Sequence, residues 1–232
     1  RELYRHLFLR ETPIVFTDLE TSELIKYAAN AFLATKITFI NEIADLCEKV
    51  GADVHDVAKG IGLDGRIGSK FLHPRPGYGG SCFPKDTMAL VRTAQEVNSP
   101  LRIVETVVDV NSKRKQFMAD KIIRGCEGSI RGKTIAILGI TFKPNTDDIR
   151  DAPSLEIIPT LQKEGANIKA YDPEGMIEGK HVLTDVNWCE NAYEAMEGAH
   201  AVAILTEWNE FRGLDVKRMN CLLYTSDAAD EG

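Results

Sequence analysis

The chain has 232 residues, of which 44% are hydrophobic and 27% are charged, and its formal net charge at pH 7 is -7. This composition is typical of a globular protein with a proper core, and the acidic balance excludes a general nucleic-acid binder because no basic excess exists to neutralise phosphates. The sequence also holds no run of about 18 apolar residues that could span a membrane, and its first residues, "RELYRHLFLRETP", lack the apolar centre of a signal peptide.

The first predicted element is one long helix over residues 17–50. Thr17 and Glu20 have the spacing of a capping box, and Gly51 stands where a terminating glycine belongs. At about 1.5 Å per residue the helix is about 48 Å long. This is too long for the interior of a small domain, so we expect the helix to join domains or subunits. Apolar residues around much of its circumference predict burial in a multi-helix or dimer core.

Three further helices are predicted before residue 126. Asp53 begins a short helix that ends near Gly60, and a glycine-rich connection follows. Pro84 begins the next helix, because proline is favoured in a first turn. Ser99 and Pro100 are predicted to cap a helix over residues 101–126.

The pattern then changes to that of an α/β domain. The β-branched run "KTIAILGI" (133–140) is typical of a buried parallel strand. A helix over 155–165 and a strand over 167–173 complete a βαβ unit, and a helix near 191–198 and a strand within 200–208 extend it. We therefore place a domain boundary near Gly128. The final "CLLYTSDAADEG" fits no element, and we interpret residues 221–232 as a tail foreign to the natural protein.

The five cysteines, one of which is Cys82, are scattered without a C-x-x-C pair or clustered histidines. This excludes the standard zinc spacings, so no metal site is predicted, and it is typical of reduced thiols in the cytoplasm. Cys82 lies at or next to the start of the helix that Pro84 begins, where the helix dipole and Lys85 favour a thiolate. Glycines 77, 79 and 80 would let a substrate approach closely. A nucleophile is favoured over a small core thiol.

Two other groups of polar residues could carry chemistry. Lys26 and Asn30 share one face of the long helix within an apolar segment. Either they belong to a site, or Lys26 reaches solvent and Asn30 bonds a neighbouring helix. Lys143 and Arg150 follow the first strand, at the edge where open α/β sheets bind ligands. A solvated charged loop is the alternative there.

Three segments together resemble the UDP-glucose/GDP-mannose dehydrogenase family, and within it the UDP-glucose 6-dehydrogenases: "ELIKYAANAFLATKITFINEIADLCE", "GIGLDGRIGSKFLHPRPGYGGSCFPKDT" and "AILGITFKPNTDDIRDAPS". The resemblance implies an N-terminal Rossmann NAD domain, with residues 1–16 as its trailing stub. It implies a helical dimerisation domain over 17–128 and a Rossmann-like UDP-binding domain over 129–220. Without the NAD domain, we expect no turnover from this chain alone.

The reaction implied by the resemblance oxidises the sugar C6 alcohol to a carboxylate with two hydride transfers to NAD. Cys82 would add to the intermediate aldehyde and form a thiohemiacetal and then a thioester. Lys26, Asn30 and Asp86 would stabilise the alkoxide and position the water.

The resemblance also implies the binding contacts. Lys85 and Arg150 would touch NAD, and Arg66 would reach the sugar bound by the neighbouring subunit of a homodimer. Arg75 departs from the family, in which small residues are usual at this position, so its contact would be through the backbone. A family arginine in the last segment has no match. The predicted substrate contacts are Phe71, Leu72, His73, Pro74, Arg75, Gly79 and Lys143.

Two alternatives remain open at this stage. One is another dehydrogenase of the same family, acting on GDP-mannose or a UDP-N-acetyl-hexosamine. The other is a non-catalytic module that binds nucleotide sugars or forms a dimer scaffold. The preferred reading is a part of a cytoplasmic UDP-glucose 6-dehydrogenase that uses NAD and forms a homodimer.

Overall fold

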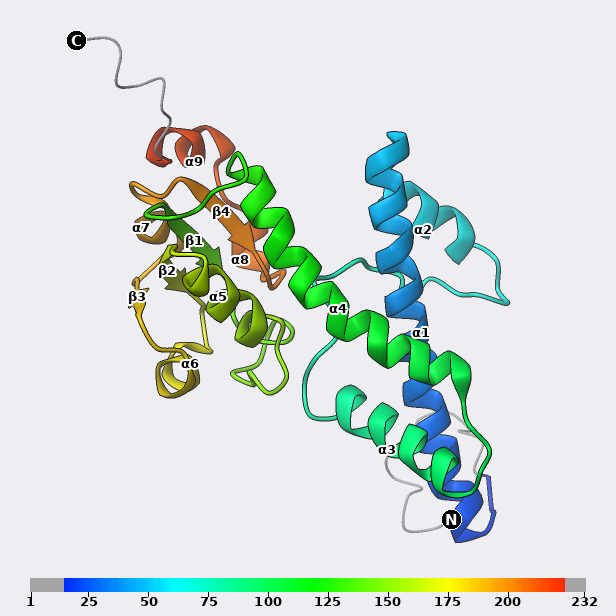
Figure 1. Cartoon of the computed structure of the whole chain (residues 1–232). Coiled ribbons are helices and arrows are strands. Elements are labelled where there is room, and N and C mark those ends of the chain that lie inside the picture. The colour runs from blue at the N-terminus through cyan, green and yellow to red at the C-terminus, as the bar shows by residue number, and fades with distance from the viewer. Residues whose placement is uncertain (1–14, 224–232) are drawn as a thin grey trace, which may run out of the picture.

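The computed structural model describes residues 15–223, in which a helical domain is followed by an α/β domain (Figure 1). This order confirms the predicted fold class. The helical part contains α1 (Leu19–Val50), α2 (Val54–Gly62), α3 (Phe83–Glu96) and α4 (Arg102–Gly125). The α/β part contains β1 (Thr134–Leu138), α5 (Ser154–Lys163), β2 (Asn167–Tyr171), α6 (Met176–Val182), β3 (Val186–Trp188), α7 (Ala192–Met196), β4 (Ala201–Ile204), α8 (Asn209–Arg212) and α9 (Val216–Leu222).

Helix α1 has the predicted length of 32 residues, but it begins one residue later than the capping box implied. Asp18 is the N-cap, and its side chain accepts a hydrogen bond of 2.6 Å from the Thr21 amide. Aspartate is a better N-cap than threonine, and its charge suits the positive helix end. Gly51 ends the helix with φ +75°, as predicted.

Helix α1 packs within the helical domain and does not connect the two domains. One face packs against α3, α4 and α2. The other face exposes four large apolar side chains seven residues apart, which we call the heptad stripe: Ile25, Phe32, Phe39 and Leu46. Phe32 is 66% exposed. Apolar side chains therefore surround much of α1, as predicted, and those of the heptad stripe are not covered by other parts of the single chain.

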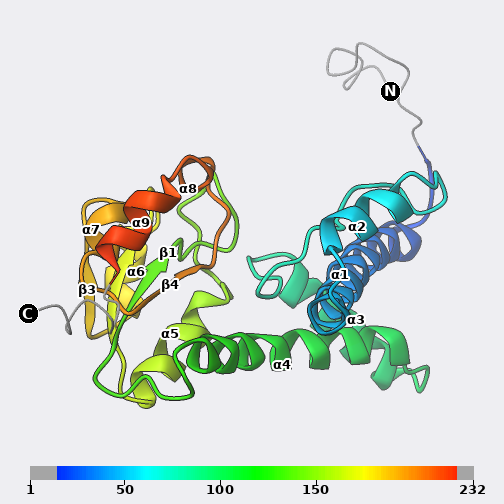
Figure 2. The same cartoon turned by 90° about the horizontal axis from the view of Figure 1, so that it is seen from above.

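Helix α4 is the element that joins the domains, and Figure 2 shows it running beneath both. Near its start, Val107 packs in a cluster with Ala34 and Ile37 of α1. Near its end, Ala119 is buried in the core of the α/β domain together with Ile157 of α5. The predicted boundary at residue 128 thus follows a helix whose two ends belong to different cores.

The start of α4 differs from the prediction. Leu101 occupies the N-cap position without a side-chain cap. The Ser99 amide donates to the carbonyl of Ala94, and Asn98 has φ +58°. Ser99 therefore completes the end of α3 rather than capping α4, because the positive φ turns the chain back onto the last carbonyls of the preceding helix.

The sheet is parallel, in the order β3-β2-β1-β4, and it is covered on both faces. Along β1, Ile135 and Ile137 point into the core formed with α4 and α5. Ala136 and Leu138 point into the opposite core, which includes Phe211. Burial on both faces explains the uninterrupted apolar run. The short elements α6, β3, α8 and α9 were not predicted. Cys221 and Leu222 belong to α9, so the segment interpreted as a foreign tail does not begin at residue 221 as predicted, and its remainder from residue 224 lies outside the described residues, as do residues 1–14 of the predicted stub.

Candidate active site

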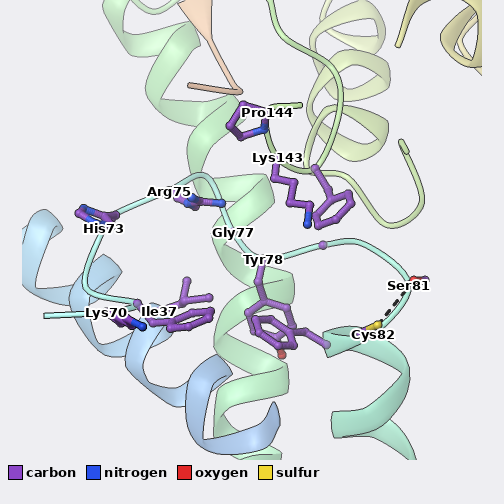
Figure 3. A pocket seen from close by; sticks show the side chains of 14 residues that line it. Ile37, Lys70, His73, Arg75, Gly77, Tyr78, Ser81, Cys82, Lys143 and Pro144 are labelled. Carbon is purple, nitrogen blue, oxygen red and sulfur yellow. Dashed lines mark hydrogen bonds between the residues drawn. The ribbon is translucent and has the colours of Figure 1, made fainter. Parts of the chain in front are cut away.

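A cavity of about 600 Å³ lies between the helical and α/β domains. Figure 3 shows Lys143 and Pro144 of the α/β domain facing residues 71–81, which we call the strap. None of the described residues lining the cavity is acidic, whereas four basic and four aromatic side chains line it: Lys70, His73, Arg75, Lys143, Phe71, Tyr78, Phe83 and Phe142. A cavity of this volume and chemistry suits an anionic ligand that carries a ring.

The strap is irregular backbone held by side chains of α1 and α4. Asn41 Oδ1 accepts from the Arg75 amide at 2.7 Å, and Arg114 Nε donates to the Arg75 carbonyl at 2.8 Å. Asn111 accepts from the Tyr78 amide at 2.8 Å and donates to the Tyr78 carbonyl at 3.1 Å. These bonds satisfy backbone groups that no helix or strand pairs, and so they fix the strap in position.

Two glycines of the strap allow the domains to touch. A Cβ on Gly79 would lie 2.3 Å from the carbonyl oxygen of Asp151, and one on Gly80 would lie 2.7 Å from the Phe142 ring. Gly80 also has φ +81°, and its amide donates to the Arg150 carbonyl at 2.7 Å. The sequence predicted that these glycines keep a substrate path open. At both positions it is the α/β domain that fills the space.

Cys82 is the N-cap residue of α3, and Pro84 lies in the first turn, as predicted. The thiol is free and exposed, and it lines the cavity. Its Sγ lies 3.7 Å from the Ser81 hydroxyl. The sulfur therefore sits at the positive end of the helix dipole and is open to a ligand.

Lys26, Asn30 and Asp86 come together at the side of α3. Asn30 Nδ2 donates to Asp86 Oδ2 at 2.6 Å, and Lys26 Nζ lies 3.4 Å from the same oxygen. Asp86 is fully buried, and its Oδ1 has no hydrogen-bond partner within the described part of the chain. The Asp86 amide donates to the Cys82 carbonyl. The Lys26 side chain is 61% exposed in the single chain, and Asn30 bonds the neighbouring helix α3, which are the two features of the alternative stated from the sequence.

The predicted substrate contacts separate into two sets. The side chains of Leu72, Pro74 and Arg66 do not line the cavity. Leu72 is buried in the core beside Ile40, Pro74 borders a different hollow, and Arg66 is exposed and paired with Asp64. The residues that do line the cavity are Phe71, His73, Arg75, Gly79 and Lys143.

Lys85 and Arg150, the predicted cofactor contacts, are both exposed. Asp148 accepts from Arg150 Nε at 2.9 Å and Nη2 at 2.7 Å. These bonds lower the pKa of Asp148 and raise the pKa of Arg150, to which the nearby Cys82 adds a smaller contribution. Arg150 is thus a fixed cation close to the thiol.

Several lining residues were missed by the sequence analysis. Lys70 directly precedes the predicted contact Phe71, and Phe142 directly precedes Lys143 in the loop after β1. Their position beside predicted contacts is the signal that could have found them. Tyr78 is another, and its pKa is raised by burial, which a hydrogen bond with Thr87 partly offsets.

The loop after β1 is held by Asp172, which is fully buried at the end of β2. Its Oδ2 accepts from the Ile140 amide at 2.7 Å and from the Trp208 indole at 3.2 Å. Its Oδ1 accepts from the Gly175 amide at 2.7 Å. A buried carboxylate needs such donors, and here they tie the Lys143 loop to the segment after β4.

Within residues 15–223, no three His, Cys, Asp or Glu side chains gather as they would around a metal ion. In the same residues, no helix combines the length and apolar character needed to cross a bilayer.

The two domains and the cysteine between them define a class of protein, and the chain belongs to the UDP-glucose/GDP-mannose dehydrogenase family. The family's central-domain model matches residues 20–113, and its UDP-binding-domain model matches residues 136–229.

The curated relatives are longer than the chain. It is 60% identical to a UDP-glucose 6-dehydrogenase of Rhizobium meliloti over 97% of its length and 51% of the relative's. It is 50% identical to UDP-glucose 6-dehydrogenase TuaD of Bacillus subtilis over 91% of its length and 46% of the relative's. The chain is also similar to the structure of a UDP-glucose dehydrogenase from Pyrobaculum islandicum, with a TM-score of 0.86 and 35% sequence identity. The match covers 92% of this chain and 49% of that protein's chain. The chain thus spans about half the length of the relatives it matches.

Proposed function

We propose that the chain is the sugar-oxidising part of an NAD-dependent UDP-glucose 6-dehydrogenase, which converts UDP-glucose to UDP-glucuronate. The observation that carries this proposal is the position of Cys82. Its exposed thiol opens into a basic, aromatic cavity between the two domains.

The cavity divides naturally between the two halves of a nucleotide sugar. Lys143, in the loop after β1, would contact the diphosphate, and the cavity aromatics would offer faces for a uracil ring. His73 and Gly79 of the strap, with the backbone of Leu72 and Pro74, are the predicted sugar contacts. The sugar C6 would then lie toward Cys82.

The chemistry requires a nucleophile at the second oxidation. An aldehyde does not readily release hydride, so the Cys82 thiolate adds to C6 and the oxygen takes up a proton. The resulting thiohemiacetal loses hydride and its hydroxyl proton to give a thioester. Water then attacks the carbonyl carbon, the C–S bond breaks, and the carboxylate and the thiol are released. Lys26 and Asn30 are the predicted donors to the oxyanion, and Asp86 is the residue predicted to position the water.

NAD, when bound, would accept one hydride per molecule, so the two oxidations would use two molecules of NAD in turn. The charges of the residues present fit the dianionic pyrophosphate of NAD. Lys85 and Arg150 are exposed cations at the start of α3 and opposite Cys82, and Asp148 holds the Arg150 side chain in place. These two residues are the ones on this chain that would hold the cofactor.

The proposed enzyme is a homodimer formed through the heptad stripe. A stripe repeating every seven residues on one face of a helix pairs with a copy of itself at a shallow crossing angle. Its side chains are large, apolar and about half exposed or more, which costs free energy unless a partner covers them. Arg66, exposed on the loop after α2, is the residue predicted to reach the neighbouring subunit's sugar.

Protection of Cys82 from alkylation tests the binding and the nucleophile together. The chain is treated with iodoacetamide with and without UDP-glucose, and each cysteine peptide is quantified by mass spectrometry. We expect UDP-glucose to slow the alkylation of Cys82 and not that of Cys221, the other exposed thiol. Equal rates at Cys82 with and without the sugar would contradict the proposal. Stronger protection by GDP-mannose or a UDP-N-acetyl-hexosamine would assign the sugar differently.

Turnover is tested with the chain joined to the N-terminal half of the Rhizobium meliloti relative. Cys82→Ser should abolish the release of UDP-glucuronate while UDP-glucose still binds. Undiminished turnover by this variant would remove Cys82 from the mechanism.

A further inference from the structure

The side chain of Arg75 crosses from the helical domain to the α/β domain. Arg75 lies on the strap, and its Nη2 forms an ion pair with Glu207 Oε1 in the connection between β4 and α8. The two side chains are 31% and 36% exposed. The pair lies at the wall of the cavity, because Arg75 lines it.

Both ends of this ion pair are anchored. On the strap side, Asn41 and Arg114 hold the amide and the carbonyl of Arg75. The Arg114 side chain is only 8% exposed, and its Nη1 donates to Asp45 at 2.6 Å. An arginine that is buried and paired in this way fixes the backbone from which the Arg75 side chain extends.

On the other side, Glu207 is joined to the loop that carries Lys143. The residue after Glu207 is Trp208, which is buried and donates to Asp172. Asp172 also accepts from the amides of Ile140 and Thr141, which precede the lining residues Phe142 and Lys143. A continuous set of bonds therefore connects the strap to the opposite wall of the cavity.

Within the described part of the chain, Arg75 with Glu207 is one of two ion pairs that bridge the domains. The other joins Lys115 of α4 to Glu156 of α5 at 2.5 Å, with the lysine side chain largely buried. Because α4 packs into both cores, the part of the domain interface beside α4 is held without Arg75. In the part of the interface beside the loop after β4, the Arg75–Glu207 ion pair joins the two domains.

We propose that Arg75 is a positioning residue that, with Glu207, latches the α/β domain to the strap and thereby sets the affinity of the cavity for a nucleotide sugar. A ligand that contacts both walls binds more tightly when their spacing is fixed beforehand, since less order is imposed on binding. Glu207 neutralises the Arg75 charge, which favours a latch over a direct contact with the diphosphate. The choice of a nucleotide sugar as the ligand rests on the proposed function. The contact between Arg75 and Glu207 that latches the two domains does not depend on it.

The test is a double-mutant cycle measured on the whole chain. The variants are Arg75→Ala, Glu207→Ala, both together, and Arg75→Lys. Arg92→Ala is the matched control, because it removes an arginine from the exposed Arg92–Glu96 pair on α3. The dissociation constant for UDP-glucose is measured by calorimetry, and circular dichroism checks that each variant is folded. Hydrogen exchange of the Gly80 amide, which bonds Arg150 across the interface, reports the latch without any ligand.

We expect each single alanine variant to weaken UDP-glucose binding about twofold to fivefold, as for a partly exposed ion pair. The double variant should bind no more weakly than either single one. Gly80 exchange should accelerate by a similar factor in all three, Arg75→Lys should recover part of both effects, and Arg92→Ala should change neither.

A different pattern would overturn the latch. If Arg75→Ala weakens binding while Glu207→Ala leaves it unchanged or tightens it, Arg75 contacts the ligand directly. Additive losses, or unchanged binding and exchange in both variants, would also overturn it. If the unsubstituted chain does not bind UDP-glucose, the proposed function fails instead. Gly80 exchange then decides the latch alone, with acceleration in both variants supporting it and unchanged rates refuting it.

Discussion

Substitution of Gly79 by alanine tests the packing of the strap against the α/β domain. The new methyl group would lie 2.3 Å from the carbonyl oxygen of Asp151 and 3.1 Å from the Cα of Ala152. Both neighbours are backbone, so no side chain can rotate away. To reach an ordinary contact of 3.4 Å, the two backbones must separate by about 1 Å. Forcing such a separation in a well-packed interface costs about 1–3 kcal/mol.

Thermal unfolding followed by circular dichroism measures this cost. At about 2–4 °C per kcal/mol for a chain of this size, Gly79→Ala should lower the Tm by about 2–12 °C. Gly60→Ala is the matched control. It lies inside α2 with no atom within 4 Å of the new methyl group, and it should raise stability by about 0.5–1 kcal/mol because alanine favours a helix. A Gly79→Ala chain that melts with the wild type or above it would refute the steric argument.

Three further predictions concern other parts of the chain. Asp172→Asn should lower the free energy of unfolding in urea by at least about 3 kcal/mol, because it removes charge-assisted bonds and places an amide donor among buried donors; unchanged unfolding would mean that the carboxylate is dispensable. Phe32→Arg should shift the chain from dimer to monomer in sedimentation equilibrium, whereas Ile103→Arg, exposed on α4 away from the heptad stripe, should not; a Phe32→Arg dimer would disprove pairing through α1. Arg150 lowers the pKa of Asp148 in the folded chain, so their ion pair should stabilise the fold above about pH 4 and lose this effect as the pH falls further. The difference in unfolding free energy between the wild type and Asp148→Asn should therefore shrink in acid. A difference that grows in acid would contradict this argument.

The features predicted well from sequence are those fixed by local chemistry. Gly51 ends α1 because glycine adopts the left-handed conformation without strain, and Pro84 lies in the first turn of α3 because its fixed φ and missing N–H suit that position. Ser99 misled the prediction, since whether a serine ends one helix or begins the next depends on the conformation of its neighbour Asn98. Strand β3 has three residues, too few for a periodic pattern.

The candidate site shows the same division. The helix-start position of Cys82 followed from the sequence, and the grouping of Lys26 with Asp86 was implied by the family resemblance. The partner of Arg75 was not predictable, because Glu207 lies far along the chain and only the assembled interface brings the two together. The approach of the α/β domain to Gly79 and Gly80 was not predictable for the same reason, because the groups that meet these two glycines belong to another domain.

The passage of α4 through both cores restricts how this family can change its length. Each residue added to a helix turns everything after it by about 100° and advances it by about 1.5 Å. A single insertion between Val107 and Ala119, which lie in different cores, would swing Lys143 away from the strap and break the cavity. The number of residues in this stretch of α4 therefore sets the distance and rotation between the two walls of the cavity. Exchange of UDP-binding domains between relatives should succeed only where the two chains agree in that count.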